Sequence, residues 1–525
     1  MVLYRPPSSG DRWSSPPPEP RIIRVLRPTD GSLVGELAVT PQADIPNRVQ
    51  RARTVQEGWA SLGPRDRVRR LRGLLKAVGN RALEIEETIV AETGKPRAEA
   101  LVEVVTVLDL IRYYLKAAPP FLEPRRVSSG WVVWKKALLT REPLGVLGII
   151  SPWNYPFILS MTPVLTALFG GNAAVLKPSE YTPYSGLLAE DLASDAGLPE
   201  GLVQVIVGPG RTGESLVRSG VDKVIFTGGT ETGRKVMAAA AETLTPVALE
   251  LGGKDAAIVL EDADLGRAAR GVAWGAFQNA GQTCMAVERV FVIESIYDAF
   301  LRELLAEVRK INAGSGARVE MGPMVVPHQL ETVETQLQEA LERGAKVQIG
   351  GHRADPASNV FHPTVVTDVD PFSSLMTEET FGPLVPVIPV KDEEEAIRRT
   401  NGSRYGLSAS VWSGDRSRGM NVARRLRVGG VSVNDSLALY AIPGLPSGGF
   451  RDSGFGRSRG LEGLGAVTQT RSVVVDRLNL KREFWWFPYD RSTEVMLWSA
   501  LQYRWRGGVR GLLAGALALM RRTRR

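Results

Sequence analysis

With 525 residues the chain is too long for one hydrophobic core, so its length predicts two or three domains. Its 43% hydrophobic and 23% charged residues are typical of a globular protein and exclude a disordered one. The net charge of +8 would suit a nucleic-acid partner, but residues 477 to 525 hold 11 Lys/Arg against 3 Asp/Glu, which accounts for the whole excess. The body of the chain is near neutral, so we expect no nucleic-acid partner.

Cysteine and histidine are scarce. One cysteine, Cys284, cannot form an intramolecular disulfide, which fits a reducing compartment such as the cytoplasm. The three histidines, at 328, 352 and 362, have no helical i, i+4 spacing and no second cysteine to join them. We therefore expect no metal site.

The N-terminal third changes from loop to helix to strand. Residues 1–20, MVLYRPPSSGDRWSSPPPEP, are rich in Pro and Ser and lack the apolar core of a signal peptide, so we expect a disordered arm. Between about 43 and 118, apolar residues recur every three to four positions, which predicts helices. Apolar and polar residues alternate in residues 130–150, GWVVWKKALLTREPLGVLGII. This pattern predicts a hairpin leading into a buried strand.

Two regions then alternate strand-like and helix-length segments. From 144 to 260 the apolar runs are LGVLGII, AAVLKPSE, LVQVIVGPG, KVIFTGGT and DAAIVLED. From 286 to about 435 they include RVFVIE, PLVPVIPV and GGVSVND. This alternation predicts an α/β fold with parallel sheets, the first region being an open, nucleotide-binding kind of domain.

Two glycine-rich turns follow strands of the first region. VGPGRTGESLV holds a literal G-x-G-x-x-G, but no acidic residue closes a well-placed strand about 20 residues later, so we favour a turn here over a pyrophosphate site. The next turn, FTGGTETG, places Thr227, Gly228, Gly229 and Gly233 at the start of a helix, whose free N–H groups and dipole suit a phosphate. A tight strand-to-helix turn is the alternative.

A third segment, AAVLKPSE, ends a buried strand in Lys177, Ser179 and Glu180. A cation and a carboxylate at the carboxyl end of a strand suit ribose hydroxyls, although a surface ion pair is the alternative.

Three residues suit chemistry on a carbonyl. Cys284 follows a glycine turn in NAGQTC, where a thiolate would be a nucleophile; elsewhere a lone cysteine is usually a small buried apolar residue. Glu250 lies in an apolar run ending in Gly-Gly, where burial raises a carboxyl pKa and suits a general base. Asn154, in SPWNYPF, could hydrogen-bond an oxyanion.

These motifs together resemble the aldehyde dehydrogenase superfamily. The matching segments cover roughly residues 22 to 475 in the family's order: SPWNYP, AAVLKPSE, FTGGTETG, LELGGKDAAIVLEDAD, NAGQTC, EETFGPLVPV, NGSRYGLSASVW and SGGFRDSGFGR. LELGGK combined with GQTC is far more specific than a single glycine motif.

The resemblance implies a mechanism and a cofactor site. Cys284 would attack an aldehyde, Asn154 and the Cys284 N–H would hold the oxyanion, hydride would pass to nicotinamide, and Glu250 would activate the water that hydrolyses the thioester. The family's cofactor positions match here Trp153, Lys177, Ser179, Glu180, Thr227, Gly228, Gly229, Gly233, Glu379 and Phe381. The regular G-x-G-x-x-G is not the family's main phosphate site.

One position departs from the pattern and bears on the cofactor. Many family members have serine where Gly229 stands. Glycine at this position lacks the serine hydroxyl that would contact the pyrophosphate. Glu180 favours NAD by repelling a 2′-phosphate, while Lys177 and Ser179 leave NADP as the alternative. The presence of Glu250 favours hydrolysis of the thioester over transfer of the acyl group to coenzyme A.

The family pattern stops near residue 476. Four of the 11 tryptophans follow among arginines, and GLLAGALALM at 511–520 is only ten residues long, half of what a membrane-spanning helix of about 20 residues needs. We expect residues 484–525 to lie on an anionic membrane surface on the cytoplasmic face, with RRTRR as an anchor, or alternatively to pack on protein.

The resemblance also implies boundaries and assembly. We expect a cofactor domain at 21–127 and 142–249, an oligomerisation hairpin at 128–141, a catalytic domain at 250–442, a return segment at 443–476 and a basic amphipathic tail at 477–525. The hairpin implies a homodimer or homotetramer. The function expected is oxidation of an aldehyde with an apolar chain to a carboxylic acid; the alternatives are a membrane-bound scaffold that keeps the fold and, more distantly, a Cys/His peptidase.

Overall fold

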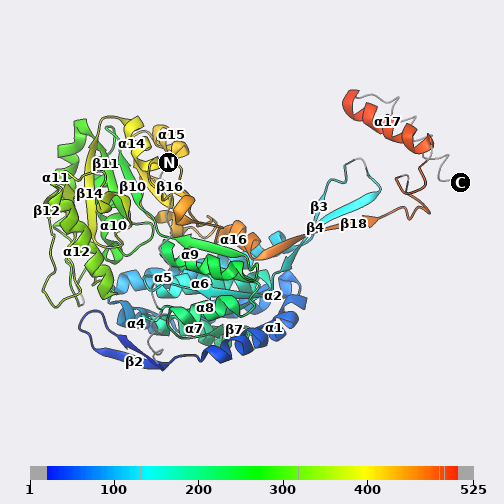
Figure 1. Ribbon diagram of the computed structural model, residues 1–525, viewed down its shortest axis with the longest axis horizontal. Coiled ribbons are helices and arrows are strands. Elements are labelled where there is room, and N and C mark those ends of the chain that lie inside the picture. Colours follow the sequence, from blue (N-terminus) through cyan, green and yellow to red (C-terminus); the bar gives the residue numbers. More distant parts are fainter. Residues whose placement is uncertain (1–20, 131, 317, 484, 490, 507–525) are drawn as a thin grey trace, which may run out of the picture. The chain divides into compact units, whose positions relative to one another are not determined.

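The structure is a computed structural model that describes residues 21–506 apart from 131, 317, 484 and 490 (Figure 1). The chain divides into two compact units, one of Met1–Glu123 and Arg141–Gln469 and the other of Pro124–Thr140 and Thr470–Arg525. The expected arm at 1–20 and the apolar run and basic end of the expected tail, at 507–525, lie outside the described residues.

The first unit begins with a hairpin and a series of helices. Strands β1 (Ile22–Leu26) and β2 (Leu33–Ala38) pair antiparallel, an element that the sequence analysis missed. The region expected to be helical is confirmed: it forms α1 (Ile45–Ser61), α2 (Pro64–Leu71), α3 (Gly73–Asn80), α4 (Ala82–Thr93) and α5 (Arg97–Leu122). Each buries one face, as the spacing of its apolar residues requires.

The first α/β domain is built on a six-stranded sheet. Its order is β17 (Gly454–Phe455), β9 (Val247–Leu251), β8 (Lys223–Gly228), β5 (Val146–Ile150), β6 (Ala173–Lys177) and β7 (Val203–Val205). Neighbouring strands are parallel except for β17 with β9. The crossover helices are α6 (Pro156–Gly170), α7 (Pro183–Asp195), α8 (Gly210–Arg218) and α9 (Thr230–Ala241).

The strand order reverses between β5 and β8. From β5 the chain moves outward through β6 to β7 and then returns to β8 on the other side of β5. Because parallel crossovers are right-handed, α6 and α7 cover one face and α8 and α9 the other. At such a reversal the loops diverge and leave a crevice beyond the carboxyl ends of the strands. Residues 151–154 follow the end of β5, and residues 227–229 span the end of β8.

A seven-stranded sheet forms the second α/β layer structure of this unit. Its order is β12 (Lys346–Ile349), β13 (Thr364–Thr367), β14 (Leu384–Val390), β11 (Val287–Ile293), β10 (Asp255–Val259), β15 (Ser408–Trp412) and β16 (Gly430–Val433). All neighbours are parallel except β12 with β13. The α/β fold class with parallel sheets is therefore confirmed.

Alternate residues of β10 face two separate cores. Ala257 and Val259 pack with α10 (Leu265–Phe277), α11 (Tyr297–Val308) and α12 (Pro327–Glu342). Ala256 and Ile258 pack with α14 (Glu393–Asn401) and α15 (Arg416–Arg425) on the other face. The remaining short helices are α13 (Ser374–Thr377) and α16 (Gly460–Ala466).

The expectation that 255–259 belongs with the strands beginning at 144 is wrong. β10 lies in the seven-stranded sheet, while the preceding β9, which the sequence analysis did not separate, completes the parallel part of the other sheet. Both segments are short apolar runs buried on two faces, so their pattern cannot assign them to one sheet or the other.

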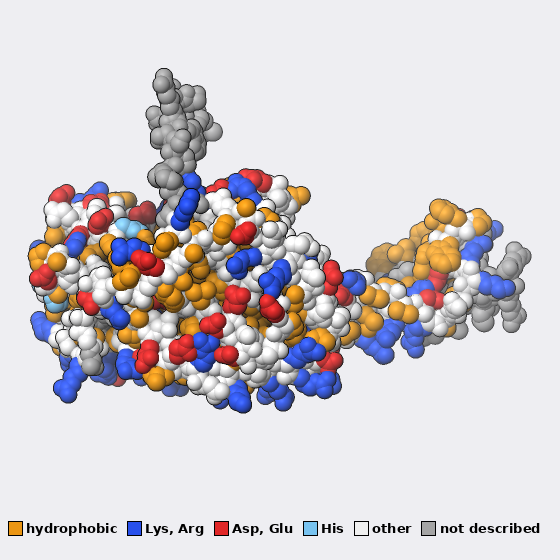
Figure 2. Space-filling model, turned by 90° about the horizontal axis from the view of Figure 1, so that it is seen from below, with side chains coloured by type: hydrophobic (Ala, Val, Ile, Leu, Met, Phe, Trp, Pro, Cys, Tyr) orange, Lys and Arg blue, Asp and Glu red, His pale blue; other side chains and the backbone are white. Residues whose placement is uncertain are grey.

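The second unit holds a three-stranded sheet and a helix. Its strands, in the order β18 (Thr468–Asp476), β4 (Lys135–Pro143) and β3 (Arg125–Val127), extend beyond the expected hairpin at 128–141. Helix α17 (Arg491–Arg506) follows. Hydrophobic side chains gather on this unit beside basic ones (Figure 2). In the described part of the chain, every helix is too short or too polar to cross a membrane.

Candidate active site

Cys284 lies in a strained turn between α10 and β11. The turn includes a 3-10 segment, Gln278–Gly281, in which Asn279 and Ala280 have φ angles of 52° and 54° and Gly281 one of 70°. A Cβ atom on Gly281 would collide with the Gly382 carbonyl. Glycine is therefore required here, and the left-handed backbone turns the chain so that Cys284 faces a cavity.

That cavity brings together the residues predicted to do chemistry. It has a volume of about 370 Å³ and is lined by Cys284, Glu250 and Asn154. Trp153, Glu379 and Phe381, which the resemblance assigns to the cofactor, line it as well. These residues come from loops of both sheets, so the cavity lies where the two sheets of this unit meet.

Asn154 ends the loop after β5 and is almost fully buried. Its Nδ2 donates a 2.9 Å hydrogen bond to the carbonyl of Gln282, two positions before Cys284. A side-chain amide carries two N–H groups, so one remains for an oxygen in the cavity. Asn154 is thus fixed beside the thiol by the same turn that presents the thiol.

Two residues that the sequence analysis missed hold Asn154 in place. Lys95 and Glu103 form an ion pair of 2.8 Å, and the side chain of each is 1% exposed. Lys95 Nζ also donates to the Asn154 carbonyl at 2.7 Å, while the second oxygen of Glu103 accepts from the N–H groups of Phe157 and Ile158 at the start of α6. Because Lys95 and Glu103 lie in the helical N-terminal region, no local pattern links them to this site.

Glu250 lies near the carboxyl end of β9, where Gly454 of β17 pairs with it. Ser447 Oγ donates to its Oε2 at 3.4 Å, and its Oε1 has no partner among the described residues. Burial raises the pKa of Glu250, and the Ser458 hydroxyl and the charge of Arg459 oppose that rise. A carboxyl that lines the cavity, with a raised pKa and one oxygen without a described partner, suits a general base.

The surroundings of Cys284 disfavour its ionised form. Its half-buried thiol lies close to carboxylates, and burial first, then Glu250, Asp255 and Glu379, raise its pKa well above the usual value. A nucleophile at this position would have to give its proton to a base, and Glu250 has an oxygen without a described partner.

A second cavity, of about 730 Å³, adjoins the first along the crevice between β5 and β8. Lys177, Ser179, Glu180, Thr227, Gly228 and Gly229 all line it, as does Trp153. The two cavities share Pro152, Trp153, Thr227, Gly228, Gly229 and Thr232. Helices α8 and α9 form its far wall through residues such as Val217 and Val236. The size falls within the range of small-molecule sites.

The glycines of the two predicted turns have different surroundings. A Cβ atom on Gly229 would meet nothing within 4 Å, so this position at the start of α9 is open toward the cavity. On Gly233 it would lie 2.7 Å from Leu251, so Gly233 allows α9 to pack on β9. Of the literal G-x-G-x-x-G, Gly210 and Gly213 line the cavity.

This donor set fits a dinucleotide. The start of α9 offers backbone N–H groups and the positive end of the helix dipole to a pyrophosphate. Lys177 Nζ and Glu180 Oε2, 3.1 Å apart, offer a donor and an acceptor to ribose hydroxyls. Val217 and Val236 supply an apolar slot for a flat ring.

The loop with Glu379 and Phe381 is held by a buried ion pair. Lys254 Nζ lies 2.7 Å from Glu288 Oε2, and Glu288 accepts from the N–H of Phe381 at 2.9 Å. The Phe381 ring meets that of Trp153 edge to face at 5.4 Å. Burial and then the charge of Glu288 raise the pKa of Glu379 to about 8. A raised pKa lets Glu379 keep its proton to a higher pH than an ordinary carboxyl, and the protonated form can both donate and accept.

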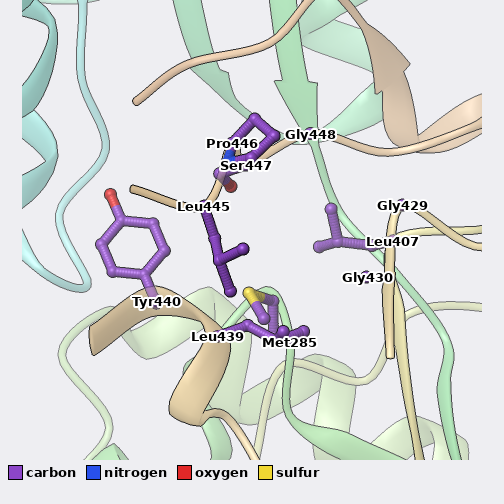
Figure 3. Close-up of a pocket in the computed structure, with 10 residues that line it drawn as sticks. All are labelled: Met285, Leu407, Gly429, Gly430, Leu439, Tyr440, Leu445, Pro446, Ser447 and Gly448. Carbon is purple, nitrogen blue, oxygen red and sulfur yellow. The ribbon is translucent and has the colours of Figure 1, made fainter. Parts of the chain in front are cut away.

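A third cavity, of about 220 Å³, extends the first one past Cys284. The two share Tyr440, Leu407 and Ser447. Its lining is almost entirely apolar: Met285, Leu407, Leu439, Leu445, Pro446 and three glycines, with Tyr440 and Ser447 at one side (Figure 3). Most of it comes from 429–430 and 439–448, segments to which the sequence analysis assigned no part in binding substrate.

Comparison with known proteins agrees with this arrangement. The profile of the aldehyde dehydrogenase family matches residues 13–473. The chain belongs to the aldehyde dehydrogenase family. It is 43% identical to the 4,4'-diapolycopene aldehyde oxidase of a Methylomonas species over 473 residues, which are 90% of this chain and 89% of that protein.

Two solved structures extend the comparison. The NAD-dependent aldehyde dehydrogenase from Sinorhizobium meliloti superposes with a TM-score of 0.85 at 34% identity, covering 89% of this chain and 93% of that one. Betaine aldehyde dehydrogenase from Staphylococcus aureus in complex with NAD+ superposes with a TM-score of 0.84 at 30% identity, covering 89% of this chain and 94% of that one. The predicted family, fold and class of enzyme, an NAD(P)-dependent aldehyde dehydrogenase, are confirmed.

Proposed function

We propose that this aldehyde dehydrogenase oxidises an aldehyde at the end of a long apolar chain to the carboxylic acid. The observation that carries the proposal is the apolar cavity that opens directly onto the Cys284 cavity and shares Tyr440 and Leu407 with it. Its described lining carries no charged side chain, so it suits hydrocarbon and not an ionised substrate. The name of the Methylomonas relative points to the same chemistry, an aldehyde on a long unsaturated hydrocarbon.

In the first step Cys284 attacks the aldehyde carbon. Glu250, whose Oε1 is free, accepts the thiol proton directly or through water. The carbonyl oxygen becomes an alkoxide, which the second N–H of the Asn154 amide and the Cys284 backbone N–H stabilise. A thiohemiacetal then links the substrate to Cys284.

The oxidation leaves a thioester, and water must then cleave it. When NAD(P) is bound, its nicotinamide ring accepts the hydride from the thiohemiacetal carbon. After Glu250 has released the thiol proton to solvent, its carboxylate withdraws a proton from water as the water attacks the thioester carbonyl, and Asn154 again stabilises the oxyanion. The acid leaves and the sulfur of Cys284 is protonated again.

The residues at the second cavity would hold the cofactor. Lys177 and Glu180 would bind the adenosine ribose, the turn at 227–229 the pyrophosphate, and Glu379 and Phe381 the nicotinamide side. Glu180 would repel a 2′-phosphate, so we favour NAD. NADP is the alternative, and the substrate series below compares the two cofactors. In this assignment the six-stranded sheet belongs to the cofactor domain, 21–127 and 142–249, and 250–442 to the catalytic domain.

The second unit would serve assembly and attachment. The three-stranded sheet leaves β18 mostly exposed, which suits pairing in a homodimer or homotetramer. Helix α17 exposes Val495, Leu497, Trp498, Leu501 and Trp505. Aromatic and aliphatic side chains beside Arg491 and Arg504 suit the headgroup layer of an anionic membrane. We propose a cytoplasmic enzyme attached peripherally through 484–525.

A chain-length series tests the proposed substrate class. The full-length enzyme is mixed with NAD or NADP and with butanal, octanal, dodecanal, retinal, succinic semialdehyde or betaine aldehyde, and reduced cofactor is followed by absorbance. Each added methylene that enters the apolar cavity contributes about 0.8 kcal/mol, so kcat/KM should rise about fourfold per methylene until the cavity is filled. A preference for succinic semialdehyde or betaine aldehyde would contradict an apolar substrate.

A further inference from the structure

Arg459 is a buried cation that the catalytic steps above do not use. It is 1% exposed and is among the largest fully buried side chains of the protein. Its Nη1 donates to the carbonyl of Tyr440, but Nε and Nη2 have no partner in the described part of the chain. A buried guanidinium with free donors is costly unless a nearby negative charge offsets it.

The backbone places Arg459 beside the general base. Gly454 of β17 pairs with Glu250 of β9. Four residues later Ser458 forms a two-way bridge with Ser447, through hydrogen bonds of 2.8 and 3.0 Å. Ser447 Oγ donates to the Glu250 carboxylate, and the Ser458 hydroxyl lowers the pKa of Glu250. Arg459 is the next residue along the chain.

An uncommon backbone conformation fixes the direction of Arg459. Its φ is 61°, in the left-handed region that non-glycine residues rarely adopt, and it precedes the first residue of α16. The guanidinium lies 4.1 Å from the centre of the Tyr440 ring and over its face. Tyr440 lines both the Cys284 cavity and the apolar cavity, so Arg459 holds the ring where the two join.

We propose that Arg459 is a positioning residue that keeps Glu250 ionised in its buried site and holds Tyr440 at the junction of the two cavities. This inference rests on the proposed function, because it concerns the base that hydrolyses the thioester. The charged and titratable groups that face Glu250 are Cys284, Tyr440, Arg457 and Arg459. Of these, Cys284 and Tyr440 are neutral acids of raised pKa, and Arg459 is the fully buried cation.

The test separates acylation from hydrolysis of the thioester in Arg459→Met, Arg459→Lys and wild type. Full-length enzyme with saturating NAD and dodecanal should give a burst of NADH followed by a linear phase, whose rate is measured from pH 5 to 9. Arg459→Met should keep a burst but lose linear rate, and the acidic limb of the linear phase should move up by about one pH unit or more, since a lost neighbouring cation raises a carboxyl pKa. Arg459→Lys, which keeps the charge, should restore the limb to its wild-type position.

Arg457→Met is the matched control. Arg457 also faces Glu250, but it is half-buried and its Nη1 donates to the Gly449 and Gly456 carbonyls. The acidic limb of the linear phase should shift less in Arg457→Met than in Arg459→Met. If Arg459→Met does not fold, as thermal unfolding would show, Arg459→Gln keeps a donor for the Tyr440 carbonyl without the charge and carries the same expectation.

The outcomes separate this inference from the proposed function. An unmoved acidic limb in the neutral variants, with burst and linear rates lowered equally, would assign Arg459 a structural role and overturn the inference alone. A wild-type enzyme that forms no reduced cofactor with any aldehyde and either cofactor would contradict the proposed function, and this inference with it.

Discussion

Lys95 donates a 2.7 Å hydrogen bond to the backbone carbonyl of Asn154 while it forms a buried ion pair with Glu103. The carbonyl also accepts from Asn279 Nδ2 at 3.0 Å. Two hydrogen bonds therefore fix the backbone of Asn154, one from the buried Lys95–Glu103 pair and one from the turn before Cys284. The fixed backbone sets the direction of the Asn154 side-chain amide. Removing one partner of such a pair leaves an unpaired buried charge, which costs about 3–5 kcal/mol.

Replacement of Asn154 and Lys95 should therefore slow the same step. Asn154→Ala should reduce the burst rate about 10²- to 10³-fold, the cost of one lost oxyanion donor. Lys95→Met should lower the midpoint of thermal unfolding and slow the burst about tenfold, the equivalent of about 1.4 kcal/mol. The double variant should be no slower than Asn154→Ala alone, because Lys95 acts through Asn154. Rate losses that multiply would contradict this coupling.

Glu250 should control hydrolysis of the thioester and its pH dependence. Glu250→Gln should slow the burst of NADH, because the thiol loses its proton acceptor, but keep the amplitude of the burst, and it should lose about 10²- to 10⁴-fold in the linear phase. Burial raises the pKa of Glu250, so its proton-accepting form is lost as the pH falls through a value above that of an ordinary carboxyl. In wild type the linear rate should fall on the acidic side at a pH above the usual 4.5 for Glu. A linear phase unchanged in Glu250→Gln would exclude Glu250 as the base.

Gly229 offers a test of the cofactor turn. Its φ of −69° suits any residue, and the space around it is open, so Gly229→Ser should fold normally and add a hydroxyl toward the pyrophosphate. The Kd for NAD, measured by calorimetry, should fall roughly threefold to tenfold, as one hydrogen bond contributes. Gly233→Ser is the control, since its Cβ would lie 2.7 Å from Leu251 and should cost stability instead. Weaker NAD binding by Gly229→Ser would place the pyrophosphate elsewhere.

Attachment to membranes should depend on the tail. The full chain should sediment with vesicles of phosphatidylcholine and phosphatidylglycerol, and a chain ending after Asp476 should stay in solution. A triple variant of the exposed residues of α17, Trp498→Ala, Leu501→Ala and Trp505→Ala, should sediment less, since each loses apolar area that the interface would cover. Equal sedimentation of the full and shortened chains would exclude a membrane role for this segment.

The sequence predicted the fold and the chemistry where local patterns carry them. Cys284, Glu250 and Asn154 each lie in a short motif beside a strand end, and all three line one cavity. The helices between 45 and 122 follow from the spacing of their apolar residues. Both the site motifs and the helices depend on residues that are close together in the sequence, so the sequence alone could predict them.

Features built from distant segments were missed. Lys95 and Glu103 are separated from Asn154 by more than 50 positions, and Arg459 lies more than 200 positions after Glu250. The apolar cavity comes from loops whose glycines and prolines have no periodicity to read. The raised pKa of Cys284 also depends on carboxylates that only the fold brings near the thiol.

The most direct test of the central claim is to trap the thioester. Glu250→Gln is mixed with dodecanal and NAD, quenched in acid and digested, and the peptide that contains Cys284, the single cysteine of the chain, is weighed by mass spectrometry. We predict a dodecanoyl group on Cys284, in an amount equal to the NADH released in the burst, and none in Cys284→Ala. A burst of NADH without an acyl group on that peptide would contradict the mechanism.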